Sequence, residues 1–306
     1  MPARLRFLGG KGGVGKTTLA AAVAVLDAGR GQRTLVVSTD PAHSLGDVLQ
    51  EGLGEEPREV GTCLWAAEVS GEAHARRRVA QIEADAAEAL PPQVRPAVRE
   101  HLARAVDSPG TVESALLDRL GELIELVPAR YDRLVVDSAP TGHMLRLLTM
   151  PELLTPWIEG LARQRERARG TDRMLAGLLG RHEEPDPLLV RLHRRRERMA
   201  GLRDRLRADA AVHLVVVPER MVWAETLRAV DALDRAGIPL GAPVVNRVLP
   251  AGGTGLLEER RAGQQQVLDA VLERFPAAAQ VPLQAGEPAG VAGLRGIAEL
   301  LERAGW

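Results

Sequence analysis

A glycine-rich segment near the N-terminus carries the residues best suited to chemistry. Gly10, Gly15, Lys16 and Thr17 fit the pattern G-x-x-x-x-G-K-[ST]. Glycines at this spacing let backbone N–H groups converge on phosphate oxygens. We expect Lys16 to reach the β- and γ-phosphates of a nucleotide and Thr17 to bind Mg²⁺. The complete set of expected nucleotide-binding residues here is Gly12, Gly13, Val14, Gly15, Lys16, Thr17 and Thr18.

The two lysines of the chain both lie in this segment. Lys11 and Lys16 stand among 40 basic residues, and all the others are arginine. Because the chain uses arginine wherever a generic positive charge is needed, these two positions indicate a requirement for a compact ammonium group. The alternative is chance placement of two rare residues.

Short apolar runs predict the strands that position this loop. Leu5 to Leu8 leads into the glycines, and an alanine-rich helix is expected over Thr18 to Ala28. Two further strands each end in an aspartate, Asp40 just after the run Thr34 to Ser38, and Asp137 at the end of Tyr131 to Asp137. The carboxyl ends of parallel strands meet at one edge of a sheet, so both carboxylates are expected beside the loop.

The rest of the chain repeats this alternation. Further strands are predicted at Val212 to Val217, Pro243 to Val248 and Gln280 to Leu283, with helices between them. Such alternation predicts an α/β fold with a doubly wound, mostly parallel sheet. Two charged stretches without strand patterns, about 72–128 and 151–209, are expected to form a helical subdomain within a single domain spanning 1–306.

Three ordered motifs together resemble the ArsA family of deviant Walker A ATPases. They are the loop with its early Lys11, the segment from Asp40 to Ser44, and the segment from Asp137 to His143. That family joins the arsenite-pump ATPase to the ATPase that delivers tail-anchored membrane proteins. The resemblance implies Mg-ATP hydrolysis by a homodimer, in which Lys11 reaches across to the phosphates of the partner, as an arginine finger does.

The same resemblance assigns further roles. Asp40 would activate the attacking water, and Asp137 would hold the Mg²⁺ shell. A switch that senses the γ-phosphate would comprise Pro140, Thr141, Gly142 and His143. Nucleotide contacts on the adenine side would come from Glu219, Asn246, Pro282, Leu283, Gln284, Ala285, Gly286, Glu287 and Pro288. The alternative is that both aspartates are ordinary turn residues and that His43 and His143 are structural.

Cysteine usage separates this chain from parts of that family. Cys63 is the single cysteine, and we expect it in the core. Arsenite sites of the known kind need several thiolates, and a dimer-bridging zinc needs a C-x-x-C pair. Neither is expected here, nor is the iron–sulfur cluster of the related nitrogenase iron protein.

Composition narrows the partners. The formal net charge is −1, so no global field favours nucleic acid, and no nucleic acid partner is expected. No leader segment or membrane-length apolar run is present, which predicts a cytoplasmic protein. An arginine-rich face over 191–207 is either a solvated helix surface or a partner-binding surface.

These observations leave three functions open. The first is a nucleotide-driven dimer switch that couples ATP hydrolysis to the handling of a membrane-protein client. The second is the energising subunit of an anion or metalloid efflux system, which acts on a membrane transporter. The third is a ParA/MinD-like positioning ATPase.

Overall fold

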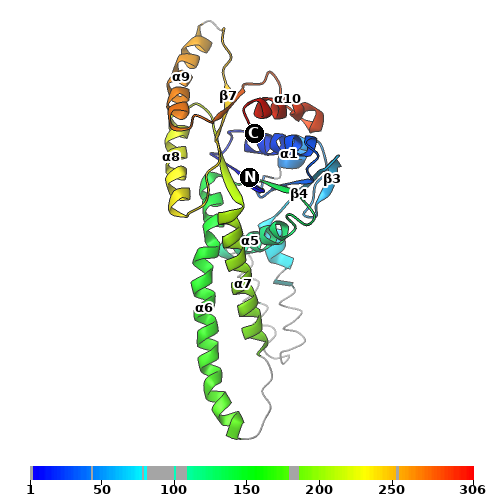
Figure 1. The fold of residues 1–306 in the computed structure, drawn as a ribbon, viewed down its shortest axis with the longest axis vertical. Helices are drawn as coiled ribbons and strands as arrows, with labels where there is room; N and C mark the ends of the chain where they lie inside the picture. The colour runs from blue at the N-terminus through cyan, green and yellow to red at the C-terminus, as the bar shows by residue number, and fades with distance from the viewer. Residues whose placement is uncertain are drawn as a thin grey trace. The chain divides into compact units, whose positions relative to one another are not determined.

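An eight-stranded sheet organises the chain (Figure 1). The structure is a computed structural model that describes residues 3–42, 44–77, 79–80, 100, 109–178, 186–252 and 255–306. The spatial order of the strands is β3-β4-β2-β5-β1-β6-β7-β8. In chain order they are β1 Leu5–Gly9, β2 Thr34–Ser38, β3 Arg58–Gly61, β4 Leu64–Glu68, β5 Arg133–Asp137, β6 Ala210–Val216, β7 Val244–Val248 and β8 Ala279–Pro282.

Helices connect most of these strands. They are α1 Lys16–Gly29, α2 Ser44–Leu49, α5 Pro109–Glu125, α6 Thr141–Leu178, α7 Pro187–Ala208, α8 Arg220–Arg235, α9 Leu256–Arg274 and α10 Gly290–Arg303. All strand pairs are parallel except β3 with β4. The predicted doubly wound, mostly parallel α/β fold is therefore confirmed.

Burial explains why the central strands read as continuous apolar runs. Every residue of β1, β2 and β5 is buried, as expected for strands covered on both faces. The alanine-rich α1 lies against these strands and also packs on α10 (Figure 1). Small alanine side chains let the helix approach the sheet closely, so the core is built mainly from Leu, Val and Ala.

Strand register sets the position of Asp137, one of the two predicted carboxylates. Asp137 pairs with Leu8 of β1 on one side and with Ser38 of β2 on the other. The ends of β1, β2 and β5 are thus level with one another. The phosphate loop after β1, the segment after β2 and the segment after β5 consequently start from the same edge of the sheet.

One hairpin was not predicted from the sequence. Strands β3 and β4 fall in a stretch for which the sequence predicted no element, and they pair antiparallel at the edge of the sheet. Their two-residue connection is Thr62 and Cys63, and Cys63 adopts a φ of 58°. The expectation that Cys63 lies in the core is wrong, because this turn leaves it only half-buried.

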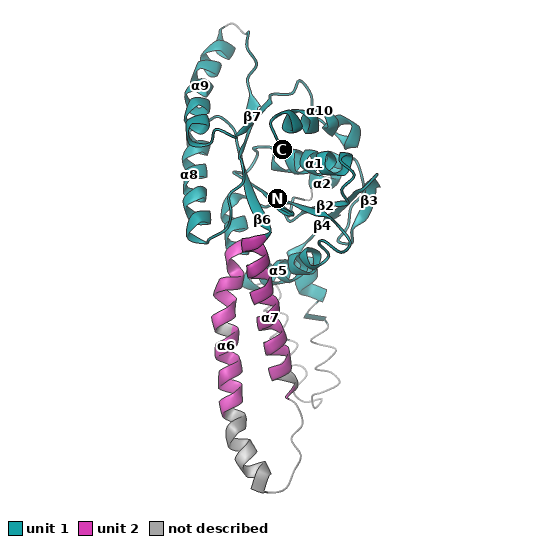
Figure 2. Cartoon of the chain, in the orientation of Figure 1, with its two compact units in different colours: residues 1–147, 209–306 teal, residues 148–208 magenta. Residues whose placement is uncertain are grey.

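The chain divides into two compact units (Figure 2). Unit 1 comprises residues 1–147 and 209–306, and unit 2 comprises residues 148–208. The described part of α5 belongs to unit 1, whereas residues 81–99 and 101–108 of the first predicted helical stretch lie outside the described residues. That the two helical stretches form one subdomain stays a prediction. Within the described ranges, no helix combines the length and apolar character needed to span a bilayer.

Candidate active site

The phosphate loop runs from the end of β1 into the first turn of α1. Gly13 and Gly15 have φ angles of 79° and 90°, which residues other than glycine rarely adopt. A Cβ at Gly15 would also collide with the side-chain amide of Asn246. Gly15 is the N-cap of α1 and gives no side-chain cap. The first N–H groups of the helix therefore remain available to an anion.

Lys16 is held over this loop. Its Nζ donates a hydrogen bond to the carbonyl of Lys11 at 3.2 Å, and the side chain is buried. Burial lowers the pKa of the ammonium group, while Asp137 and Asp40 favour its charged form. The loop thus encloses a compact cation whose nearest counter-charges are the two predicted carboxylates. Lys11, by contrast, is exposed.

The side chains of Ser38 and Asp137 and the backbone of Asp40 form a polar network at the ends of β2 and β5. The hydroxyl of Ser38 donates to Oδ2 of Asp137 at 3.0 Å and accepts from the backbone N–H of Asp40 at 3.3 Å. The Asp40 carboxylate in turn accepts the N–H of Ala42 at 3.1 Å. Asp137 is completely buried, and Asp40 is half-buried. His43, which follows in this segment, lies outside the described residues.

The donor set around Asp137 fits a magnesium ion. Oδ1 of Asp137 is buried without any hydrogen-bond partner. Burial raises the pKa of Asp137 to about 6, although hydrogen bonds from Thr17 and Ser38 lower it. The Thr17 hydroxyl also lies 3.1 Å from that of Ser44. A buried carboxylate oxygen with an unmet interaction beside a hydroxyl matches how Mg²⁺ binds, through few protein oxygens together with phosphate.

The predicted switch begins α6. The N–H of Thr141 donates to the carbonyl of Gly10 at 3.3 Å, so the switch is bonded to the phosphate loop. Thr141 is buried, whereas Pro140, Gly142 and His143 are exposed. The N–H of His143 bonds to the carbonyl of Pro140 at 2.9 Å. A displacement of the phosphate loop would therefore displace the first turn of α6.

Most of the predicted adenine-side residues surround one cavity of about 560 Å³. Asn246 anchors it, because its Nδ2 donates to the carbonyl of Val14 at 2.8 Å. The cavity volume suits a nucleoside-sized ligand. Its predicted lining residues are Gly15, Thr18, Asn246, Pro282, Leu283, Gln284, Ala285, Gly286, Glu287 and Pro288.

Glu219 does not line this cavity but a neighbouring one. It lines a second cavity of about 460 Å³ together with Lys11, Gly12, Gly13 and Val14 of the phosphate loop. The carboxylate of Glu219 is 3.6 Å from the guanidinium of Arg260, and its side chain is about half exposed. The structure thus brings the exposed Lys11 and Glu219 together on one surface, next to the cavity that Asn246 anchors, since Arg247 and Leu283 line both cavities.

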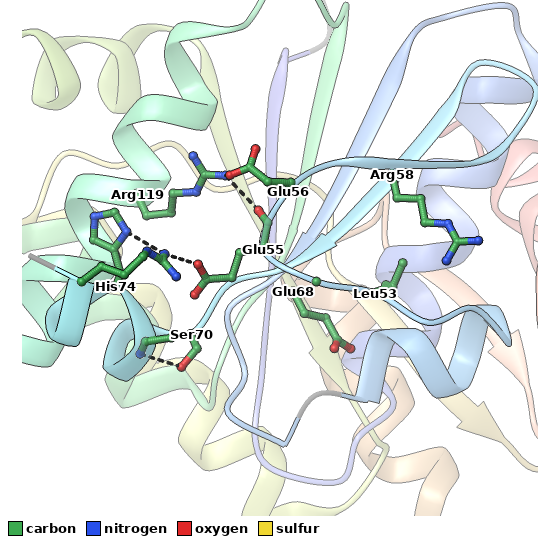
Figure 3. A pocket seen from close by; sticks show the side chains of 11 residues that line it. Leu53, Glu55, Glu56, Arg58, Glu68, Ser70, His74 and Arg119 are labelled. Atoms are coloured by element: carbon green, nitrogen blue, oxygen red, sulfur yellow. Dashed lines mark hydrogen bonds and ion pairs between the residues drawn. The ribbon is translucent and has the colours of Figure 1, made fainter.

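A larger cavity of about 840 Å³ contains none of the predicted residues (Figure 3). Its arginines are already partnered. Arg119 bonds to Glu56 at 2.9 Å, Arg77 pairs with Glu55, and Arg58 lies 3.6 Å from the carboxylate of Glu51. Because these cations are neutralised within the protein, the cavity does not offer the free positive charge that a phosphate group requires.

Sequence reasoning missed two positioning residues. Ser38 links Asp137 to Asp40, as described above. Glu68, at the end of β4, accepts the N–H of Gly46 at 2.8 Å and so fixes the start of α2, just after the Asp40 segment (Figure 3). Glu68 is buried. A glutamate at the end of an apolar strand can indicate a positioning residue. Glu68 was missed because β4 was not predicted from the sequence.

Together these groups can hold a polyphosphate and a divalent cation beside a carboxylate. The loop supplies N–H groups and the Lys16 ammonium for the phosphates. Asp137 and Thr17 offer oxygens to a metal, and Asp40 offers a carboxylate at the same edge of the sheet. This is the combination of parts that phosphoryl transfer to water requires.

Comparison with known proteins gives one consistent result. The sequence profile of the family described as anion-transporting ATPase, ArsA_ATPase, matches residues 3–303. The chain is 30% identical to "ATPase ASNA1 homolog 1" of Paramecium tetraurelia, over 96% of the chain and 91% of that protein. It is also 30% identical to "ATPase GET3B" of Arabidopsis thaliana, over 96% and 78%. The "Putative arsenical pump-driving ATPase" of Prosthecochloris vibrioformis is 31% identical, over 89% and 68%.

Proposed function

The chain belongs to the ArsA family of anion-transporting ATPases, and on that premise we propose that it is a dimeric, Mg-ATP-driven switch that handles a membrane-protein client. ATP hydrolysis follows from the family, whose members compared above are named ATPases. The dimer, the metal, the roles of individual residues and the client are our proposal.

The proposed chemistry assigns each group one task. The N–H groups of Gly12 to Thr18 and the Lys16 ammonium bind the phosphates. Thr17 and Asp137 hold Mg²⁺, which supplies charge neutralisation at the phosphates. The Asp40 carboxylate orients a water for attack on the γ-phosphorus and accepts its proton. Asn246 and the segment from Pro282 to Pro288 enclose the adenine.

A single structural observation supports the switch. Helix α6 starts at Thr141 inside the predicted γ-phosphate switch and continues to Leu178 in unit 2. A continuous helix transmits displacement along its axis. Pro151 and Pro156 lie within it and lack the N–H groups that would bond one turn back, near the boundary between the units. The helix thus connects nucleotide chemistry to a potential output surface.

Hydrogen exchange provides the test of this coupling. We expect protection across residues 148–208 to differ between the protein with a slowly hydrolysed ATP analogue and the protein with ADP, because release of the γ-phosphate frees the start of α6. The C-terminal half of α8, residues 228–235, lines neither of the two cavities beside the phosphate loop and serves as the internal control. Changes limited to the phosphate loop would show that unit 2 is scaffold rather than output.

The dimer is supported by the exposure of Lys11. A lysine required for catalysis in its own site should face that site, but Lys11 lies on the surface that includes Glu219. We propose that this surface faces a second copy of the chain and that Lys11 reaches the phosphates bound there. A cation delivered in this way offsets charge in the transition state.

Mixed dimers test that proposal. Lys11→Ala and Asp40→Asn proteins should each be nearly inactive. In a mixed dimer, the Lys11→Ala protomer keeps Asp40 and receives Lys11 from its partner. Random mixing should therefore restore about a quarter of wild-type turnover, since half of the dimers are mixed and each has one competent site. Mixing Lys11→Ala with the double variant Lys11→Ala/Asp40→Asn should restore nothing. No recovery in the first mixture, with mixed dimers confirmed by mass, would contradict action across the dimer.

A second candidate is an energising subunit of an efflux system. It is supported by the relative named as a pump-driving ATPase. Arsenite or antimonite should then stimulate ATP hydrolysis. Since Cys63 is the only cysteine, such stimulation would have to survive Cys63→Ser, because one thiol is too few for a thiolate site.

A further inference from the structure

The charge of the chain is divided unequally between the two units. Residues 148–208 contain 14 arginines and 9 acidic residues, a net charge of +5. The remaining 26 basic and 32 acidic residues give unit 1 a net charge of −6. The overall charge of −1 thus conceals a strongly cationic helical unit, which is the pattern of a segment that meets an anionic partner.

Most acidic side chains of unit 2 form ion pairs within that unit. Glu159 pairs with Arg163 at 3.8 Å, and Asp186 with Arg165 at 2.8 Å. Further pairs are Glu152 with Arg207, Glu166 with His193 and, within α7, Asp204 with Arg203. Two of these contacts join α6 to α7, which run side by side within unit 2 (Figure 2). These carboxylates therefore stabilise the helix pair, and none of the five pairs with Arg194 or Arg198 of α7.

One face of α7 carries the excess charge. Arg191, Arg194 and Arg198 are spaced by three and four residues, so they lie along one side of the helix, and all three are exposed. Arg194 and Arg198 make no ion pair with any residue that the structure describes. Val190 lies on the same side and is 46% exposed. We call Val190, Arg191, Arg194 and Arg198 the α7 basic face.

Apolar side chains are exposed in the same unit. Besides Val190, Leu153 of α6 is 70% exposed. The interior of the helix pair is conventional, with Ile158, Met199 and Leu206 buried. Leu153 and Val190 are thus not needed to hold α6 and α7 together, and each leaves an apolar group at the surface of a cationic unit.

We propose that unit 2 docks on the anionic headgroups of a phospholipid bilayer through the α7 basic face. Guanidinium groups match phosphate oxygens with paired N–H donors, and they are attracted to anionic lipid at long range. The exposed Val190 of this face can enter the headgroup layer, as apolar residues of interfacial helices do. This docking goes beyond the proposed function and would place the ATPase beside a membrane-embedded client or transporter.

The composition of unit 2 favours a lipid surface over nucleic acid. Residues 148–208 contain no Phe or Tyr and one Trp, whereas proteins that bind single strands stack bases on several aromatic rings. Exposed apolar side chains gain nothing from a phosphodiester backbone. They do gain from contact with the boundary of a bilayer.

Vesicle co-sedimentation tests the proposal with the full-length protein. We expect salt-dependent binding to phosphatidylcholine vesicles that contain phosphatidylglycerol, and little binding to pure phosphatidylcholine. The triple variant Arg191→Gln/Arg194→Gln/Arg198→Gln should bind about 100-fold more weakly at low salt, from roughly fivefold for each arginine near an anionic surface. The matched control Arg228→Gln/Arg235→Gln/Arg261→Gln removes the same charge from exposed positions of α8 and α9 in unit 1. It should bind as the wild type does.

Two outcomes would overturn the proposal. Equal losses in both triple variants would mean that net charge alone governs binding. Full displacement from vesicles by duplex DNA, with tight DNA binding by the wild type, would assign the face to nucleic acid. Basal ATP hydrolysis and the far-UV circular dichroism spectrum should be unchanged in both variants. If the triple variant misfolds, Arg194→Gln/Arg198→Gln should still lose about 25-fold.

Discussion

Asp137→Asn should make the nucleotide-free protein more stable at pH 8 while it removes Mg-dependent activity. The carboxylate is completely buried, and one of its oxygens has no hydrogen-bond partner. Without a cation, its charge costs free energy that an amide would not. We expect the free energy of unfolding at pH 8 to rise by about 2 to 3 kcal/mol, and Mg-dependent turnover to fall roughly 10- to 100-fold.

The pH dependence gives this prediction its sign. Burial raises the pKa of Asp137 to about 6 in the folded protein, whereas an unfolded aspartate titrates near about 3.9. Between these values the folded state binds more protons, so stability decreases as pH rises from about 4 to about 6 and levels off above that. Urea unfolding of wild type and variant at pH 4, pH 5 and pH 8 should show a difference that is small at pH 4, about half of its full size at pH 5 and largest at pH 8. A variant that is less stable at pH 8 would show that the buried charge is already compensated.

Asp27→Asn is the matched control, because it is the same substitution at another buried aspartate. Burial also raises the pKa of Asp27. Its two oxygens, however, accept hydrogen bonds from Arg6 at 3.1 and 2.9 Å. Loss of that charge leaves a buried guanidinium without a counter-ion, which costs about 3 to 5 kcal/mol. The two variants should therefore change stability in opposite directions, although their burial is alike.

The central fold could be predicted because its signals are local. The strands around the phosphate loop are continuous apolar runs between turn residues, since both faces are covered. The hairpin of β3 and β4 lacks these signals. Its edge strand is partly exposed, and its turn residues, Thr62 and Cys63, are not the asparagine and glycine that favour tight hairpins. A positive φ is uncommon for a residue other than glycine, asparagine or aspartate, so the cysteine at this position does not predict the turn.

The candidate site likewise has a part that could be predicted from local sequence and a part that depends on the fold. The phosphate loop is one contiguous pattern, so its residues could be named in advance. The bond from Ser38 to Asp137 joins positions 99 residues apart, and the bond from Asn246 to the loop joins positions 232 apart. Such contacts depend on strand order and register. Glu219 and Asn246 line two neighbouring cavities that share Arg247 and Leu283, so the nucleotide contact of Glu219 stays a prediction.

Asp40→Asn should separate nucleotide binding from hydrolysis. Asparagine keeps the oxygen that accepts the N–H of Ala42, so the turn after β2 should persist. It also keeps the backbone N–H that donates to Ser38. What it loses is the negative charge that orients water and accepts a proton. We expect kcat to fall by at least about 100-fold, the scale of a positioned general base, while the Kd for Mg-ATP measured by calorimetry changes little.

The position of Asp40 in its network explains why this separation should be clean. Its carboxylate lies at the sheet edge near the loop, but the phosphate-binding groups belong to α1 and the residues before it. The oxygens proposed to bind the metal belong to Asp137 and Thr17. Removing one charge from Asp40 thus leaves both sets of groups in place. Asp231→Asn, at an exposed position of α8, is the control and should leave both constants unchanged. Turnover at the wild-type level in Asp40→Asn would remove this residue from the mechanism, and a large loss of Mg-ATP affinity would instead assign it to the binding of the metal.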